Sequence, residues 1–264
     1  MNQTRRDLLI GSTLACICAA AGMPLAALGA SSDYSTPTPV DSGPGKKFDA
    51  QGRAQAFPGN TVICPISASN PGFAVLHAAY EALYEEVASE RLAKLPASSF
   101  HMTVFDGALD ARRQPGDWPH MLPLDASMQE CNQHVGDALR KMAIEIKTPI
   151  RMKIDPVDAS GVSTLVYLTP VDAQEEQRLR RLREELTRAT GIRHQGAESY
   201  RFHTSFAYYI HRFTRDEFAA YQVAYRRMVR RLNRTLAVIE LGAPEYCLFD
   251  DMTAFHSQFA LGHR

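Results

Sequence analysis

An internal repeat constrains the fold of this chain more than any other feature of its sequence. A strand-like run, an amphipathic helical segment and a strand-like run that bears a histidine follow one another twice. The first set occupies 60–66, 71–94 and 99–105, and the second occupies 163–168, 171–190 and 201–206. His203 follows His101 by 102 positions, and Thr164 follows Thr61 by 103. Spacings that match so closely predict the duplication of one strand–helix–strand unit.

The repeat predicts an α+β fold, namely a bilobal, pseudo-symmetric duplication. Two antiparallel sheets are expected to line a central groove, with helices on the outer faces. Several strand-like runs alternate between apolar and polar residues, which is typical of antiparallel sheets with one packed face. No glycine-rich turn leads from a strand into a helix, which argues against a parallel wound sheet. Further helices are expected at 126–143 and 214–239, and further strands at 150–154, 246–249 and 253–256.

The first thirty residues are expected to be a targeting signal rather than part of the folded domain. Arg5 and Arg6 precede a weakly apolar, Ala-rich run that ends in small residues, which resembles a twin-arginine export signal. The alternative is a membrane anchor, which glycines and Pro24 within the run disfavour. We expect cleavage near 29–31 after export by the twin-arginine machinery. The product would be a periplasmic or secreted protein with no stable membrane span.

The rest of the chain is expected to divide into an arm, one bilobal domain and a short tail. Residues 31–56 are rich in Ser, Thr, Pro and Gly without an apolar period, which indicates a linker or an N-terminal arm that hugs the surface. The folded domain is predicted over 57–258, with lobes at about 57–148 and 149–258. Residues 259–264 are predicted to be a tail.

Composition fits a globular protein. Of 264 residues, 45% are hydrophobic and 22% charged, and 29 Lys and Arg balance 29 Asp and Glu. These values exclude a disordered or collagen-like chain, and the zero net charge argues against a broad basic surface for nucleic acid. Three cysteines lie beyond the signal: Cys64, Cys131 and Cys247. Their odd number and lack of paired spacing support neither a zinc site nor a disulfide framework, and leave one bridge open.

Each repeat carries a histidine and a hydroxyl group on one strand. The first motif reads His-Met-Thr-Val from His101, and the second reads His-Thr-Ser-Phe from His203. Side chains at i and i+2 share one face of a strand, so each imidazole should lie beside Thr103 or Ser205 while the residues between them pack. None of the other seven histidines has Ser or Thr two positions later. We interpret the pair as functional, and the alternative is two buried structural histidines.

These motifs resemble the signature of the two-histidine phosphoesterases, a superfamily that includes RNA 2′,3′-cyclic phosphodiesterases. That signature, once per lobe, is His, any residue, Ser or Thr, then a hydrophobic residue. The resemblance covers the chain from about Phe57 to about His256, and the region around Trp118 resembles an exported bacterial branch of unassigned function. It implies a phosphoric diester hydrolase that opens a cyclic phosphate, in a 2′,3′-cyclic nucleotide or at an RNA end. Such an enzyme uses His/His general acid–base catalysis and needs neither a metal nor a cofactor.

Phosphodiester cleavage suits a pair of histidines. One group must take a proton from the attacking oxygen and another must give a proton to the leaving oxygen, and histidine titrates near neutrality. We therefore expect His101 and His203 to be catalytic, and Thr103 and Ser205 to bind the substrate phosphate. Arg201 shares the strand face of His203 and is a further phosphate-binding candidate. The alternative is an exposed arginine at a strand end.

Two aromatic residues and two further histidines complete the set of candidates. Phe105 and Trp118 are candidates for stacking a base, although a Trp beside a proline also commonly fills a core. A groove that binds a phosphate or nucleotide without chemistry stays open as a second function. A third is a metal-dependent hydrolase with His194 and His256 as added zinc ligands, although their spacings match no standard motif. The expected partner is a small phosphodiester or cyclic nucleotide, and the expected state is a monomer.

Overall fold

The computed structural model describes residues 41–155 and 164–262. The predicted export signal, the first ten residues of the predicted arm and the last two residues of the predicted tail lie outside these ranges. Within them, no helix is long and apolar enough to cross a membrane.

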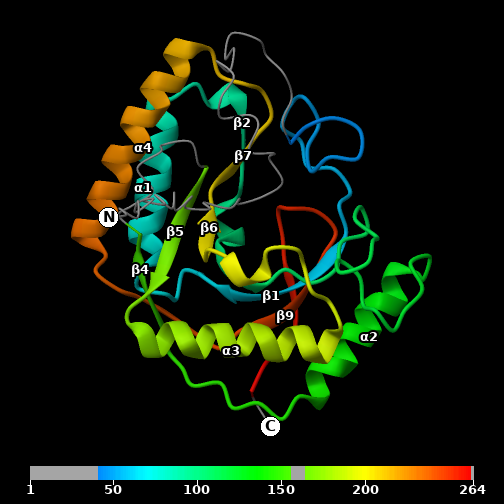
Figure 1. Cartoon of the computed structure of the whole chain (residues 1–264). Coiled ribbons are helices and arrows are strands. Elements are labelled where there is room, and N and C mark those ends of the chain that lie inside the picture. Colours follow the sequence, from blue (N-terminus) through cyan, green and yellow to red (C-terminus); the bar gives the residue numbers. More distant parts are fainter. Residues whose placement is uncertain (1–40, 156–163, 263–264) are drawn as a thin grey trace, which may run out of the picture.

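Two four-stranded antiparallel sheets and a short ribbon form the β-structure (Figure 1). The first sheet has the order β10 (His256–Ala260), β9 (Glu245–Phe249), β1 (Gly59–Pro65) and β3 (His101–Phe105). The second has the order β6 (His203–Ser205), β5 (Leu165–Pro170), β4 (Ile150–Ile154) and β8 (Ile239–Leu241). The ribbon pairs β2 (Leu92–Lys94) with β7 (Ala207–Tyr209).

The helices pack in pairs against this β-structure. The first pair is α1 (Phe73–Glu86) and α4 (Arg215–Thr235), which run side by side in Figure 1. The second pair is α2 (Met128–Lys141) and α3 (Ala173–Thr190); in that view α3 lies below β1 and β9, and α2 lies to their right. Both pairs contribute buried apolar side chains to one core that also holds the inner faces of the sheets. The expected mixture of helices and antiparallel sheets is therefore confirmed.

Local signals set several helix ends as the sequence predicts. The Thr214 hydroxyl accepts a hydrogen bond from the amide of Glu217, whose carboxylate accepts one from the amide of Thr214, so α4 begins in a capping box. Gly191 ends α3 with a φ of +70°, a left-handed conformation that favours glycine.

The first helix is shorter than its apolar spacing predicts. It was expected over 71–94, but α1 ends at Glu86 and the chain becomes extended at Val87. Leu92 falls at a helical position in the sequence, yet it lies in β2 opposite Tyr209. Pairing with a distant strand overrides the local periodicity here, because β7 offers backbone hydrogen bonds that the sequence around Leu92 cannot reveal.

The last strand lies later than predicted. A strand was expected at 253–256, but the Asp251 carboxylate accepts hydrogen bonds from the amide and hydroxyl of Thr253 and holds a turn there. β10 begins at His256 and ends at Ala260, so the predicted boundary at 258 is two residues too early.

The described part of the N-terminal segment, residues 41–56, packs on the domain, and we call it the arm. The Asp41 amide donates to the Tyr209 carbonyl at 2.8 Å, and the Ser42 hydroxyl donates to the Ile210 carbonyl at 2.7 Å. Phe48 is buried in an apolar cluster with Ala93, Leu95, Ile210, Phe249 and Met252. These residues therefore form an arm, one of the two alternatives that composition left open.

The same strand pairing recurs around each motif histidine. Pro65 lies opposite His101 in the first sheet, and Tyr167 lies opposite His203 in the second. The residue after each of these partners donates its amide to the residue before each histidine, from Ile66 to Phe100 and from Leu168 to Phe202, both at 2.8 Å. The two histidines thus occupy matching positions in two matching strand pairs.

The three cysteines in the described residues are buried and free. Burial raises the pKa of Cys131 to about 11 and that of Cys247 to about 12. All three cysteines therefore act as apolar core residues. The disulfide bond that the sequence left open is not formed.

Candidate active site

The two motif strands meet where the sheets approach each other. β3 and β6 are in contact, although they belong to different sheets. His101, Thr103, His203 and Ser205 are half-buried, whereas the residues between and after them in each motif are buried. The alternation predicted from strand parity is confirmed, so both imidazoles and both hydroxyl-bearing side chains lie on the open faces of their strands.

Both imidazoles are held in the same way. His101 Nδ1 lies 2.7 Å from the carbonyl oxygen of Ser99, and His203 Nδ1 lies 2.9 Å from the carbonyl oxygen of Arg201. A carbonyl oxygen only accepts hydrogen bonds, so Nδ1 must carry the hydrogen in each ring. In a neutral ring the lone pair is then on Nε2. Each strand therefore fixes a tautomer that presents Nε2 for proton transfer.

Four polar groups of the motifs are left without partners. The Nε2 atoms of both rings and the hydroxyls of Thr103 and Ser205 have no hydrogen-bond partner among residues 41–155 and 164–262. Polar groups of half-buried residues that lack a partner can bind a ligand without breaking a hydrogen bond within the protein.

Burial and local charge lower the pKa of both histidines. Burial lowers the pKa of His101 to about 4, the hydrogen bond to Ser99 opposes this change, and the charge of His203 adds to it. Burial also lowers the pKa of His203, while its hydrogen bond to Arg201 and the carboxylate of Asp106 oppose this effect. The charge of one histidine acts on the other, which indicates one shared site.

Arg201 lies beside this site, but its charge is already balanced. Its Nη2 donates to the Asp155 carboxylate at 2.9 Å, and its guanidinium lies 3.6 Å from the ring centre of Tyr167. Tyr167 in turn packs edge-on against His203, with 6.1 Å between ring centres. Arg201 is thus close enough to influence a ligand, yet it is held by other groups.

Phe105 and Trp118 do not offer faces for stacking. Their side chains are 3% and 1% exposed, respectively. The Trp118 Nε1 donates to the Pro123 carbonyl at 3.1 Å, and the guanidinium of Arg113 lies 4.6 Å from the indole centre. The structure therefore favours the alternative in which these rings fill the core, and the base-stacking expectation is not supported.

Other aromatic residues contact the motif histidines. The half-buried Phe255 packs edge-on against His101, with 4.4 Å between ring centres, and Tyr200 lies 5.9 Å from His203. The Tyr200 hydroxyl also donates to the Thr103 carbonyl at 3.4 Å, and Arg183 stacks on its ring at 3.8 Å. Sequence reasoning missed Phe255 because its contact with His101 depends on the turn after β9. Strand parity likewise gave no sign of the hydrogen bond from Tyr200 across to β3.

Two charged residues near His203 were also missed. Asp106 follows β3 directly and favours the protonated form of His203, whereas Lys47 from the arm disfavours it. The one sequence signal for Lys47 is its place before Phe48, a lone aromatic residue in a polar segment.

The two additional histidines lie elsewhere. His194 bonds through Nδ1 to the Asp117 carboxylate and through Nε2 to the Gly107 carbonyl at 2.9 Å, while His256 is exposed on β10. Among the residues that the structure describes, no group of three or more His, Cys, Asp and Glu is arranged to hold a metal ion.

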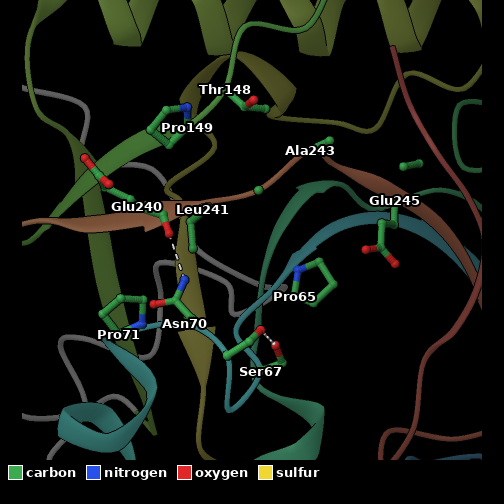
Figure 2. Close-up of a pocket in the computed structure, with 13 residues that line it drawn as sticks. Pro65, Ser67, Asn70, Pro71, Thr148, Pro149, Glu240, Leu241, Ala243 and Glu245 are labelled. Atoms are coloured by element: carbon green, nitrogen blue, oxygen red, sulfur yellow. Dashed lines mark hydrogen bonds between the residues drawn. The ribbon is translucent and has the colours of Figure 1, made fainter. Parts of the chain in front are cut away.

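A cavity of about 610 Å³ lies where β1 and β8 end and β4 begins (Figure 2). Pro65, Thr148, Pro149 and Glu240 line it, and the Asn70 amide donates to the Glu240 carbonyl at 2.7 Å. Its lining includes neither motif histidine nor either motif hydroxyl. The cavity therefore does not explain the paired motifs.

Residues 47–163 match a family described as 2H-phosphodiest, a domain of unknown function (DUF1868). This part of the chain is therefore similar to the two-histidine phosphoesterases, in agreement with the resemblance of the paired motifs. The matched region contains His101 and Thr103 and ends before His203. A search of curated proteins finds no significant match.

The fold also resembles a solved structure. A conserved protein of unknown function from Agrobacterium tumefaciens strain C58 is 23% identical to this chain. The similarity covers 86% of this chain and 94% of that one, with a TM-score of 0.77. At this identity the likeness concerns the fold alone.

Proposed function

We propose that this protein is a metal-independent phosphodiesterase that opens a cyclic phosphate by general acid–base catalysis with His101 and His203. The observation that carries the proposal is the matched pair of imidazoles. Each ring is locked through Nδ1 by the carbonyl two residues earlier, and each presents an unpartnered Nε2 beside an unpartnered hydroxyl.

The proposed reaction is an in-line hydrolysis. One imidazole Nε2 takes a proton from water as its oxygen forms a bond to phosphorus. One P–O bond of the cyclic phosphate breaks on the opposite side, and the other imidazole gives its proton to the departing oxygen. The product is a phosphomonoester with a free hydroxyl. The hydroxyls of Thr103 and Ser205 donate to the non-bridging oxygens as negative charge builds up.

Burial and the charges near each histidine favour His101 as the general base and His203 as the general acid. His101 has the pKa of about 4 and is neutral in the free protein near neutral pH, as a base must be. The Asp106 carboxylate favours the protonated form of His203, as an acid requires. We therefore assign His101 as the base and His203 as the acid in hydrolysis.

The proposed substrate is a 2′,3′-cyclic nucleotide or a cyclic phosphate at an RNA end. Phe255 supplies an aromatic surface next to His101 on which a base can stack, in place of Phe105 and Trp118. Arg201 contributes at the edge of the site. A compact ligand of this kind suits a chain with no excess of basic residues.

We also propose that the domain consists of two pseudo-symmetric lobes around a central groove. The support is the recurrence of strand pairing and of one backbone hydrogen bond about each histidine. In such an arrangement each lobe supplies one histidine and one hydroxyl to opposite sides of the phosphorus.

The test is a panel of 2′,3′-cyclic nucleotides, RNA with a cyclic phosphate end, and linear diesters, assayed with and without EDTA. We expect turnover of at least one cyclic phosphate by the wild type in EDTA, and loss of about 10²–10⁴-fold in kcat for His101→Ala and for His203→Ala. His77→Ala removes a half-buried histidine on α1 that lies outside both motifs, and it serves as the matched control. Circular dichroism checks that each variant is folded.

Other outcomes separate the competing functions. Full activity in both single variants would overturn the proposal. Binding of cyclic phosphates without turnover would indicate a binding module on the same groove. Activity that EDTA abolishes and Zn²⁺ restores would indicate a metal-dependent hydrolase.

A further inference from the structure

The arm brings a lysine to the edge of the two-histidine site. Lys47 is half-buried, and its Nζ lies 4.1 Å from the ring centre of Tyr208 in β7. β7 follows β6 after a single residue, so Tyr208 is five positions from His203 in adjoining strands. The charge of Lys47 also acts on the titration of His203. Tyr208 and Phe255 pack against the same apolar cluster, and Phe255 contacts His101. The cluster thus connects the Lys47–Tyr208 contact with the edge of the two-histidine site.

The backbone around Lys47 is fixed on both sides. The Gln55 amide donates to the Lys47 carbonyl at 2.9 Å, and the next residue, Phe48, is buried with 1% exposure. The Asp41 amide and the Ser42 hydroxyl bond to the chain at the end of β7. A lysine on a freely moving linker would lose much of its side-chain and backbone entropy on binding a ligand. The packed arm removes most of the backbone part of that cost.

Lys47 differs from Arg201 in forming no ion pair, although its charge tends to lower the pKa of Asp41, which burial raises. In the described ranges 41–155 and 164–262, no Asp or Glu oxygen lies within ion-pair distance of Lys47 Nζ. Arg201 is paired with Asp155 at 2.9 Å. An ammonium group that is partly removed from water and lies against an aromatic ring can still donate hydrogen bonds to an anion. Its neighbour Lys46 is exposed and serves as the comparison.

We propose that Lys47 is the cationic side chain that binds the substrate phosphate at the two-histidine site, and that the arm serves to position it. This proposal rests on the proposed phosphodiester chemistry, which defines the ligand as a phosphate flanked by His101 and His203. The Tyr208 ring orients the ammonium group. On binding, Nζ donates to a non-bridging oxygen of the phosphate on the side of His203.

The first test measures phosphate binding by the folded chain that lacks residues 1–30, with Lys47→Met, Lys47→Arg and Lys46→Met. Inorganic phosphate is the probe, titrated by calorimetry. A hydrogen bond from a charged donor contributes enough to change affinity by about tenfold to a hundredfold. We expect a loss of that size for Lys47→Met, substantial retention for Lys47→Arg, and no change for Lys46→Met. Lys47→Gln, a second neutral variant, must reproduce the result of Lys47→Met.

The second test reads the charge directly. Removing a nearby positive charge favours the imidazolium, so the pKa of His203 followed by NMR should rise in Lys47→Met and stay unchanged in Lys46→Met and Lys47→Arg. A purely structural role for Lys47 would not produce this pattern. Wild-type phosphate affinity together with a wild-type titration of His203 in folded Lys47→Met would overturn the inference.

These measurements also separate the two proposals. If His101→Ala and His203→Ala are inactive while Lys47→Met behaves as wild type, the catalytic proposal stands and the role of Lys47 is wrong. In the opposite case, Lys47→Met binds phosphate weakly, while either both histidine variants keep full activity or no substrate is turned over. Phosphate binding by Lys47 then stands, and the catalytic proposal is wrong.

Discussion

At the residue scale, two imidazoles with the same tautomer are the basis of the proposed chemistry. The i, i+2 spacing within a strand was enough to predict that His101 and Thr103 share one face, as do His203 and Ser205. The tautomer was not predictable, because it depends on the carbonyl of Ser99 or Arg201 lying within reach of Nδ1. The contacts of Phe255 with His101 and of Lys47 with Tyr208 could not be predicted either, since both arise only through tertiary packing.

The lowered pKa values predict an acidic pH optimum for kcat/KM. Hydrolysis needs His101 neutral, so activity should fall as the pH drops through about 4. It also needs His203 protonated, and the pKa of His203 is below its usual 6.5, so activity should fall as the pH rises through a value below 6.5. The profile is measured with a cyclic phosphate at constant ionic strength.

A variant at Asp106 tests the second limb of that profile. Asp106→Asn removes a negative charge that favours the imidazolium of His203, so the alkaline limb should move to lower pH while the limb near 4 moves less. His77→Ala should keep both limbs. An alkaline limb of the wild type above about pH 7 would contradict the assignment of His203 as the acid.

At the scale of elements, local signals fixed the ends of helices better than they fixed the strands. Thr214 and Gly191 mark real helix ends, because their effects depend on neighbouring backbone groups alone. The early end of α1 escaped prediction for the opposite reason, because it depends on pairing with the distant strand β7. The position of β10 depends instead on the turn that the Asp251 carboxylate and Thr253 form before it.

The end of α3 gives a prediction for stability. Gly191 and Gly196 both have positive φ, of +70° and +75°. A Cβ added at Gly191 would lie 2.1 Å from His120 Nδ1, whereas at Gly196 the nearest atom is Ser199 Oγ at 3.6 Å. Gly196→Ala should therefore cost only the backbone strain, about 1–2 kcal/mol of the free energy of unfolding. Gly191→Ala should cost about 1–3 kcal/mol more, because His120 must move.

Urea denaturation of the two variants measures this difference. The pair is well matched, since both glycines lie in the same loop region and share a backbone conformation. Equal losses would show that the His120 side chain moves aside freely and that the loop before α2 does not depend on its contact with Gly191.

At the scale of the whole molecule, the sequence predicted the order of the strands and helices, but it did not predict how the arm packs on the domain. Periodicity gave strand, helix and strand twice, and composition marked the segment before Phe57 as separate. Nothing in composition shows that Phe48 fills a cluster built from Ala93, Ile210 and Phe249. Those partners are scattered along the chain, so the arm could be recognised as such only in three dimensions.

Export remains a prediction at this scale. Replacing both Arg5 and Arg6 by Lys should keep the protein in the cytoplasm at its full length, whereas the wild type should reach the periplasm with a new N-terminus near residues 29–31. Cell fractionation and intact-mass measurement test this, with Arg53→Lys as the control. An unprocessed wild-type protein that stays in the cytoplasm would contradict the export signal.

The arm also bears on the order in which the protein can assemble. Phe48 packs against Phe249 and Met252, which follow it in the chain by 201 and 204 positions. Because synthesis proceeds from the N-terminus, Phe48 cannot reach its buried position until those residues have also been made. Both motif histidines are made before Phe249, so they are present before the arm can pack. Lys47 precedes Phe48 directly, and we expect its contact with Tyr208 to form at the same stage.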